Sequence, residues 1–212
     1  MSDDQNNTVE RYSEYDNWAW LYNITAGPAY SEKQSQLLEK VLFPSLKTGD
    51  NLLDICCGTG QLLQQLLDRG FNVTGLDGSE QMLGHAKNNA PKARMLLADA
   101  RDFAVTEKFH GAICTSASLN HISSIKELRH VFQCAAEALH PDAVFVFDIN
   151  HRQQMQTYWR GQAAEGEIHA DYAWLITPNF DQATQSGNFN IDIYRRENTA
   201  VNAYKKMVGK IL

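Results

Sequence analysis

The sequence predicts an α/β protein with a doubly wound, mostly parallel sheet. Between about residues 50 and 150, short apolar runs alternate with segments of helical periodicity. The runs are continuously apolar, as expected when helices cover both faces of a sheet. Glycine or aspartate follows several of them, at the edge where such sheets bind ligands. We expect strands at residues 51–56, 72–76, 94–97, 111–115 and 143–148.

Helices are predicted between these strands, at residues 60–69, 79–89 and 123–140. Ser79 and Ser123 are suitable N-caps, because a serine hydroxyl can accept a free N–H of the first helical turn. Gly70 closes the first of these helices and Pro141 follows the last.

The first 48 residues are predicted to form helices that cap the sheet. Residues 10–22 are rich in tyrosine and tryptophan, and Gly27-Pro28 is expected to break this helix. Ser31 is the predicted N-cap of a second helix.

The pattern changes after residue 150. Residues 167–177 and 188–195 alternate as half-exposed antiparallel strands do, with a connection at 179–187, and residues 198–212 are predicted to be helical or frayed. We expect one domain over residues 1–212: cap helices at 1–48, a cofactor-binding core at 49–150 and a substrate-side antiparallel segment at 151–212.

Composition excludes several classes of function. The 212 residues carry a net charge of -6, which argues against a nucleic acid partner because binding a phosphate backbone requires a basic face. We find neither a signal peptide nor a run long enough to span a membrane. The four cysteines follow no metal-ligand spacing, so we expect reduced thiols, no bound metal and a cytoplasmic location.

The clearest chemical signal is the segment from Leu52 to Gly60, Leu-Leu-Asp-Ile-Cys-Cys-Gly-Thr-Gly. It joins a predicted strand to a predicted helix, and its glycines allow a ligand to approach the backbone closely. Asp54 adds a carboxylate near a cationic or hydroxylated ligand. A Gly-x-Gly pair alone is weak evidence, because many tight turns contain one.

Two more carboxylates follow the next strands. Asp77 ends the second strand and can accept both hydroxyl groups of a ribose, whereas Asp99 ends the third and can accept an adenine amino group. Met82, one turn into the next helix, can pack on the adenine face. Three acids and a glycine loop at consecutive strand ends indicate an adenosine-bearing ligand.

These segments resemble successive motifs of the class I S-adenosylmethionine (SAM)-dependent methyltransferases of small molecules. The similarity covers about residues 10–150 and implies a Rossmann-like methyltransferase fold with SAM as cofactor. It further implies that Gly58, Thr59 and Gly60 lie at the methionine portion, with Asp54 near its amino group. Asp77 and Gly78 would meet the ribose, and Asp99 with Ala100 the adenine.

The resemblance also implies roles outside these motifs. Backbone beyond the fourth strand lines the methyl-donor pocket in such enzymes, which makes Thr115 and Ser116 candidates. Tyr15 and Tyr22 resemble cap-helix tyrosines that close over cofactor and substrate, although core packing of an amphipathic helix explains them equally well.

The sequence departs from the family after residue 148. The family fold adds a sixth and a seventh strand as an antiparallel hairpin at one sheet edge. Either residues 167–177 and 188–195 occupy those positions or the chain lacks them, and an uncovered edge would favour a homodimer.

The predicted reaction is methyl transfer to an unidentified small molecule. A general base is needed only if the acceptor is protonated at neutral pH, and His121 and His151 are weak candidates because they follow the fourth and fifth strands. A surface histidine without a catalytic role explains either one more simply.

Two other functions compete with this prediction. An oxidoreductase using a nicotinamide dinucleotide would need Gly-x-Gly-x-x-Gly, but Leu63 occupies the third glycine position. A non-catalytic SAM-binding sensor or partner subunit fits the cofactor motifs equally well, because binding and catalysis use different residues.

Overall fold

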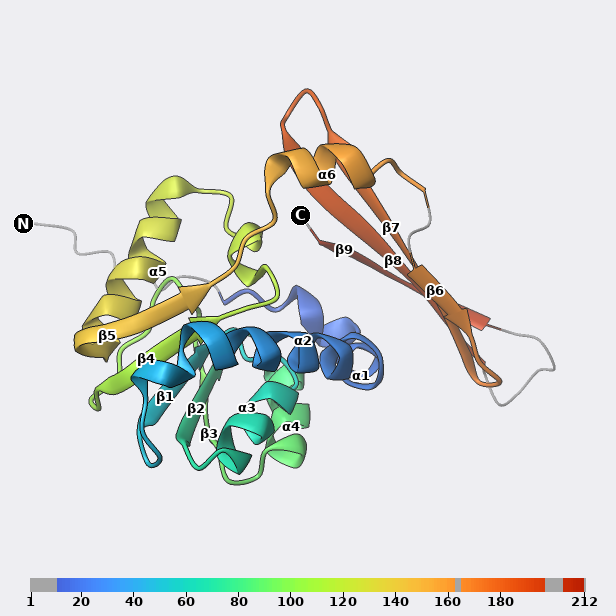
Figure 1. The fold of residues 1–212 in the computed structure, drawn as a ribbon. Coiled ribbons are helices and arrows are strands. Elements are labelled where there is room, and N and C mark those ends of the chain that lie inside the picture. Colours follow the sequence, from blue (N-terminus) through green and yellow to red (C-terminus); the bar gives the residue numbers. More distant parts are fainter. Residues whose placement is uncertain (1–10, 163–164, 197–203, 212) are drawn as a thin grey trace, which may run out of the picture. The chain divides into compact units, whose positions relative to one another are not determined.

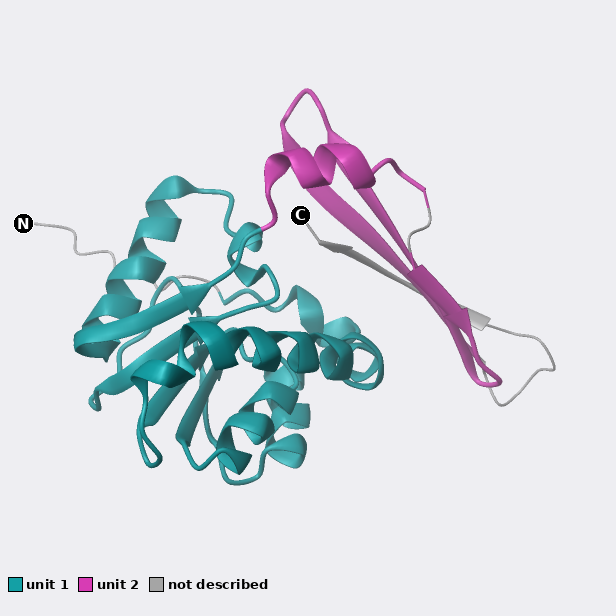
Figure 2. Cartoon of the chain, in the orientation of Figure 1, with its two compact units in different colours: residues 1–149 teal, residues 150–212 magenta. Residues whose placement is uncertain are grey.

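The computed structural model describes residues 11–162, 165–196 and 204–211, so the predicted helix start at Glu10 lies outside the described residues. The chain divides into two compact units, residues 1–149 and 150–212 (Figure 2). Each unit has its own sheet and is described separately. None of the described helices is long and apolar enough to cross a membrane.

The first unit is built on five parallel strands in the order β3-β2-β1-β4-β5 (Figure 1). This confirms the predicted fold class, and the last strand begins four residues before its predicted start at residue 143. The strand order reverses between β1 and β4, which creates the switch point where open α/β sheets bind ligands. The strands are β1 (Asn51–Ile55), β2 (Asn72–Asp77), β3 (Arg94–Leu97), β4 (Phe109–Cys114) and β5 (Leu139–Phe147).

Two clusters of buried side chains lie on the two faces of this sheet. Successive residues of a strand point to opposite faces, and in β1 Leu52 joins one cluster whereas Leu53 joins the other. The first cluster packs under α2 (Ala26–Val41), α3 (Gln61–Asp68) and α4 (Glu80–Asn89), and the second under α5 (Ile125–Ala138) (Figure 1). Burial on both faces explains the continuously apolar strands. Shorter elements complete the unit: η1 (Glu14–Asn17), α1 (Ala19–Ile24), η2 (Phe43–Ser45) and η3 (Ser118–His121).

The predicted break at Gly27-Pro28 is misplaced, because the helical segment is interrupted at Thr25, between α1 and α2, and α2 begins at Ala26 and continues through both residues. Proline is tolerated there since an N–H in the first helical turn has no partner within the helix. Ser31 is consequently a buried residue inside α2, where its hydroxyl donates to the Pro28 carbonyl at 2.8 Å, and not an N-cap.

The predicted caps of the later helices are partly confirmed. Ser79 caps α4, and its hydroxyl accepts the N–H of Met82 at 3.0 Å. The cap of α5 is Ser124 and not Ser123, because the hydroxyl of Ser124 accepts the N–H of Glu127.

Within its described residues, the second unit is a four-stranded antiparallel sheet in the order β6-β7-β8-β9, with one helix. Its elements are α6 (Arg152–Tyr158), β6 (Glu165–Ile168), β7 (Tyr172–Asp181), β8 (Ser186–Arg196) and β9 (Tyr204–Ile211). Trp174, Phe180, Ile191 and Ile193 are buried in it.

Three predictions for this region are corrected. Residues 167–177 are not one strand, because a turn closed by the His169 N–H and the Tyr172 carbonyl separates β6 from β7. The connection predicted at 179–187 shrinks to a turn at 182–185. Residues 204–211 form a strand and not a helix, since pairing with β8 outweighs local propensity. Residues 198–203 and 212 of that prediction lie outside the described residues.

The pairing of β6 to β9 shows how the parallel sheet ends beyond β5. β6 to β9 form a sheet of their own and do not extend the parallel sheet beyond β5. Within the described residues, β5 therefore pairs with β4 alone and the parallel sheet ends there.

Candidate cofactor site

The loop between β1 and α3 is shaped by two glycines with left-handed backbone. Gly58 has φ +55° and Gly60 has φ +81°, values that favour glycine. The two residues have different surroundings. A Cβ on Gly58 would meet only the Tyr22 ring at 3.6 Å, whereas a Cβ on Gly60 would lie 2.8 Å from Cα and Cβ of Ala86 in α4. Gly58 thus leaves space beside the loop, and Gly60 allows close packing of the loop against α4.

Two hollows lie at the carboxyl ends of the strands, next to this loop. The larger, which we call the β2–β3 hollow, has a volume of about 110 Å³ and is lined by the ends of β2 and β3. The smaller, the β1–β4 hollow, has a volume of about 50 Å³ and includes Asp54 and Thr115. The residues that line both are Tyr22, Cys56, Gly58, Ser116 and Ser118.

The hollows bring together almost all of the site residues predicted from sequence. Tyr15, Asp77, Gly78, Met82, Asp99, Ala100 and His121 line the β2–β3 hollow, whereas Asp54, Thr59 and Thr115 line the β1–β4 hollow, and Tyr22, Gly58 and Ser116 line both. Gly60 lines neither. His151 belongs to the second unit, where its Nδ1 accepts the N–H of Gln153 and caps α6.

Asp77 links the end of β2 to the glycine loop. Its Oδ2 accepts the N–H of Gly58 at 2.8 Å, and its Oδ1 accepts the N–H of Ser79 at 2.9 Å. Burial raises the pKa of Asp77 to about 6, and these backbone hydrogen bonds limit the rise. Each oxygen keeps acceptor capacity, so the carboxylate can also receive two ligand hydroxyl groups.

The carboxylate of Asp99 accepts more hydrogen bonds from the protein than the sequence suggested. Its oxygens accept the backbone N–H of Arg101, two N–H groups of the Arg101 guanidinium and the backbone N–H of Tyr12, at 2.8 to 3.0 Å. Burial acts to raise the pKa of Asp99, but these hydrogen bonds and the charge of Arg101 outweigh it and lower the pKa. Arg101 also binds Glu127 at 3.1 Å, so Asp99 is held firmly in an ionised state.

The carboxylate of Asp54 differs from that of Asp99 in its hydrogen bonds. It is 2% exposed, yet none of the described residues donates a hydrogen bond to its carboxylate. Burial and the nearby charge of Asp77 raise its pKa well above the usual value. A buried carboxylate without a partner is costly, and a ligand cation beside it would remove that cost.

The N-terminal segment closes over the β2–β3 hollow. The hydroxyl of Tyr12 lies 3.2 Å from Nδ1 of His121 and that of Tyr15 lies 3.1 Å from its Nε2. The segment crosses Gly78 so closely that a Cβ there would lie 2.5 Å from the Tyr12 carbonyl oxygen. Burial raises the pKa of Tyr15 and Tyr22, so both are neutral hydrogen-bonding groups at neutral pH.

Sequence reasoning did not select several lining residues, including Cys56, Arg101 and Ser118. Cys56 adopts φ +62°, which is uncommon for a residue with a side chain, and it faces both hollows. Its position two residues after Asp54 was the available signal. Arg101, two residues after Asp99, could have been found in the same way.

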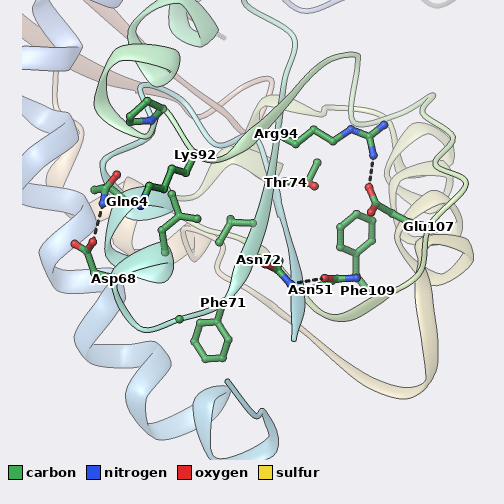
Figure 3. Close-up of a pocket in the computed structure, with 14 residues that line it drawn as sticks. Asn51, Gln64, Asp68, Phe71, Asn72, Thr74, Lys92, Arg94, Glu107 and Phe109 are labelled. Carbon is green, nitrogen blue, oxygen red and sulfur yellow. Dashed lines mark hydrogen bonds and ion pairs between the residues drawn. The ribbon is translucent and has the colours of Figure 1, made fainter. Parts of the chain in front are cut away.

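A third and larger hollow of about 580 Å³ lies at the opposite, amino ends of β1 to β4. Figure 3 shows this amino-end hollow, in which Arg94 pairs with Glu107, Gln64 donates to Asp68, and Asn72 donates to Asn51. Most of its labelled polar side chains therefore satisfy one another. Neither a glycine loop nor an unpartnered buried carboxylate is found there among the described residues.

Known proteins share this domain. Residues 52–142 match the family profile described as "Methyltransferase domain". An N,N-dimethyltransferase of dTDP-3-amino-3,4,6-trideoxy-alpha-D-glucopyranose from Streptomyces venezuelae is 28% identical over 152 residues, which are 71% of this chain and 60% of that enzyme. An uncharacterized methyltransferase from Synechocystis is 28% identical over 182 residues, 82% of this chain and 84% of that protein.

The fold is shared as well. The crystal structure of a SAM-dependent methyltransferase from Clostridium acetobutylicum matches with a TM-score of 0.74 and 23% identity, over 93% of this chain and 80% of that one. The chain thus spans less than two thirds of the Streptomyces venezuelae relative but most of the other two proteins. Residues 52–142 thus carry the methyltransferase domain, and the chain has the fold of a SAM-dependent methyltransferase.

The residues at the carboxyl edge fit SAM, its cofactor. The unpartnered Asp54 carboxylate suits the ammonium of the methionine portion, and the space beside Gly58 lets that portion approach the loop. Asp77 suits the ribose hydroxyls, and Met82, which is 2% exposed and lines the β2–β3 hollow, suits the adenine face. When bound, SAM supplies an activated methyl group on a sulfonium.

Proposed function

We propose that this chain transfers a methyl group to a small-molecule acceptor, and that a sugar carrying an amino group is the first acceptor class to test. The observation that carries the proposal is the lining of the β1–β4 hollow. Besides Asp54 it consists largely of neutral hydrogen-bonding groups, and neither Arg nor Lys is among its lining residues. The hydroxyl and amide groups considered for the acceptor are those of Tyr22, Tyr30, Gln34, Thr115, Ser116 and Ser118. Those of Ser31, Thr59 and Gln61 also line the hollow but form hydrogen bonds within the protein.

Such a lining suits a polyhydroxylated molecule, because hydroxyl and amide groups can donate to and accept from sugar hydroxyls. The name of the Streptomyces venezuelae relative, an amino-sugar N,N-dimethyltransferase, supports an amine as the acceptor group. The net charge of -6 supports a small molecule over a nucleic acid.

Methyl transfer asks the protein mainly to hold an acceptor lone pair in line with the methyl group, since the cofactor provides the activation. An ammonium acceptor must first lose a proton. His121 is the candidate base within the β2–β3 hollow, but both of its ring nitrogens lie within hydrogen-bond distance of Tyr12 or Tyr15. It would accept the proton only after exchanging one tyrosine hydroxyl for the acceptor.

The proposal includes two further expectations from the sequence. We propose a cytoplasmic location, which is supported by the four cysteines, all present as free thiols. We also propose a homodimer, which is supported by the unpaired edge of β5 within the described residues.

The test is turnover of SAM with a panel of amino sugars, sugars without an amine and amines without a sugar, followed by the formation of S-adenosylhomocysteine (SAH). We expect product only with acceptors that carry a free amine, and the highest kcat/KM with amino sugars. Equal turnover of sugars without an amine would reject the amine. Tight SAH binding without turnover of any acceptor would instead support the non-catalytic SAM-binding protein.

A further inference from the structure

Four polar side chains from separate elements form one hydrogen-bond network behind the glycine loop. We call it the Asn23 network. The Nδ2 of Asn89 donates to Asn23 Oδ1 at 2.6 Å, and the Nε2 of Gln61 donates to the same oxygen at 3.0 Å. The hydroxyl of Thr59 donates to Gln61 Oε1 at 2.6 Å. The network thereby joins α1, the loop, the start of α3 and the end of α4.

The Asn23 network holds the centre of the glycine loop through the backbone and the side chain of Thr59. Thr59 lies between the two left-handed glycines and is 1% exposed. Its carbonyl accepts the N–H of Asn89 Nδ2 at 2.7 Å, while its hydroxyl is held by Gln61. A chain segment with two glycines has much conformational freedom to lose, so these two attachments restrict the loop to one shape.

The same network holds the cap helix α1. Gln61 Nε2 donates to the backbone carbonyl of Asn23 at 3.1 Å as well as to its side chain. The neighbouring residue, Tyr22, faces Gly58 and lines both the β1–β4 hollow and the β2–β3 hollow. At Gly27, where α2 begins, a Cβ would lie 2.8 Å from both Gln61 Oε1 and Thr59 Oγ1. Cap helix and glycine loop are consequently attached through the same few atoms.

We propose that Asn23, Gln61 and Asn89 are positioning residues for SAM, and that they couple cofactor binding at the loop to docking of α1. The loop presents Gly58 to the cofactor only in the shape that the network holds, and Tyr22 reaches the hollows only when α1 is docked. Because coupling is reciprocal, bound cofactor must also stabilise the docked cap. The inference rests on the SAM site and is independent of the acceptor.

The hydrogen-bond directions provide a sharp test. The Asn23 side chain acts as an acceptor for two donors, so Asn23→Asp keeps both hydrogen bonds. Asn89 acts as a double donor, so Asn89→Asp removes both hydrogen bonds and faces two acceptors with a carboxylate. The two variants have the same chemical change and the same charge, yet opposite outcomes are expected.

The first readout is SAH affinity, measured by calorimetry on the intact chain. We expect Asn23→Asp to stay within about threefold of the parent, and Asn23→Leu and Asn89→Asp to bind about tenfold or more weakly, since a lost or unpaired buried hydrogen bond changes an equilibrium by this amount. Gln61→Glu, which keeps the acceptor for Thr59 but loses the donor to Asn23, is a second weakening variant should Asn89→Asp not fold.

The second readout is amide hydrogen exchange of residues 12–24 with and without SAH, which requires no turnover. SAH should slow exchange there in the parent and in Asn23→Asp, and this protection should disappear in Asn23→Leu and Gln61→Glu. Asn72→Asp is the matched control. Asn72 Nδ2 also makes two hydrogen bonds, to the Gly49 carbonyl and Asn51 Oδ1, but at the amino ends of the strands. Figure 3 shows the hydrogen bond to Asn51. It should lower thermal stability and leave SAH affinity and cap protection unchanged.

Two results would overturn the proposal. If Asn23→Asp binds SAH as weakly as Asn23→Leu, the acceptor role is wrong. If the weakening variants lose affinity while SAH still protects residues 12–24, the network supports the loop but does not couple it to the cap.

Discussion

The two ends of the parallel sheet differ in both size and chemistry. The amino-end hollow is the larger, at about 580 Å³, and its polar groups largely pair with one another, as in Arg94–Glu107. The carboxyl-end hollows measure about 110 and 50 Å³. They nevertheless contain the left-handed Gly58 and the buried, unpartnered Asp54.

The comparison shows that volume is a poor guide to a site in this fold. Parallel strands point their carboxyl ends toward the glycine loop and the first turn of the following helices, so free N–H groups and acidic side chains collect there. At the amino ends, side chains meet solvent and satisfy one another. A ligand gains most where the protein leaves polar groups without partners.

The largest expected effect comes from Gly60→Ala. A side chain at φ +81° costs about 1–2 kcal/mol, and a Cβ 2.8 Å from Ala86 adds an overpacking cost of about 1–3 kcal/mol. We expect a total loss of about 3 kcal/mol in the free energy of unfolding, measured by urea denaturation, together with weakened SAH binding.

Gly49→Ala is the control at the amino ends of the strands. Gly49 has φ +90°, but its Cβ would meet nothing within 4 Å, so only the backbone cost of about 1–2 kcal/mol applies. If the two variants lose equal stability, the close packing at Gly60 does not matter.

Asp54→Asn should change binding and stability in opposite directions. Removing the charge that pairs with the cofactor ammonium should weaken SAH binding by about 30-fold or more. Burial raises the pKa of Asp54, which means that the fold disfavours its charge, so the ligand-free variant should melt at a higher temperature.

Asp68→Asn is the matched change in the amino-end hollow, where Asp68 accepts from Gln64 on the same exposed helix surface. Asp68→Asn should change neither the SAH affinity nor the melting temperature measurably. A fall in the melting temperature of Asp54→Asn would show that the carboxylate stabilises the ligand-free protein after all.

SAH affinity should fall as the pH decreases through about 6. The pKa of Asp77 is raised to about 6, and the ribose is best bound by the ionised carboxylate, so affinity should drop by up to about tenfold between pH 7 and pH 5. The contribution of Asp77 to folding has the opposite sign. A folded-state pKa above the unfolded value means that the folded state gains the proton first, so this contribution increases as the pH falls from about 6 to about 4.

Calorimetry over this pH range tests the assignment. In Asp77→Asn the affinity should be low throughout, and the step near pH 6 should be absent. An unchanged step in that variant would assign the titration to another group.

The smallest effect is expected for Arg94→Ala in the amino-end hollow. Its ion pair with Glu107 is largely exposed, so its loss should change the free energy of unfolding by less than about 1 kcal/mol. SAH affinity should not change. A severalfold loss of SAH affinity would mean that the two ends of the sheet communicate.

Local sequence signals were sufficient where each strand is followed by its own ligand-facing residue. Asp54, Asp77 and Asp99 were found because parallel strands align their carboxyl ends at one edge. Long-range contacts were not accessible in this way. The hydrogen bond from the Tyr12 N–H to Asp99 spans 87 positions, and no local pattern indicates it.

The C-terminal strands illustrate the same limit. Residues 204–211 have no strong strand signal of their own, and their pairing with β8 makes them a strand. In the same way, Pro28 marked a helix break in the sequence, whereas the structure places it in a helical first turn that tolerates it.

The sequence by itself determined the parallel α/β fold, the glycine loop and the three acids, because periodicity and strand-end chemistry are local properties. Only the tertiary structure decided which acid is left without a partner. Asp99 accepts hydrogen bonds from Arg101 and Tyr12, Asp77 accepts hydrogen bonds from backbone N–H groups, and Asp54 is buried with no donor among the described residues. That difference depends on which side chains and backbone groups the rest of the chain places beside each acid. Because Asp54 receives no such donor among the described residues, it is the carboxylate available to pair with a cationic group of the cofactor.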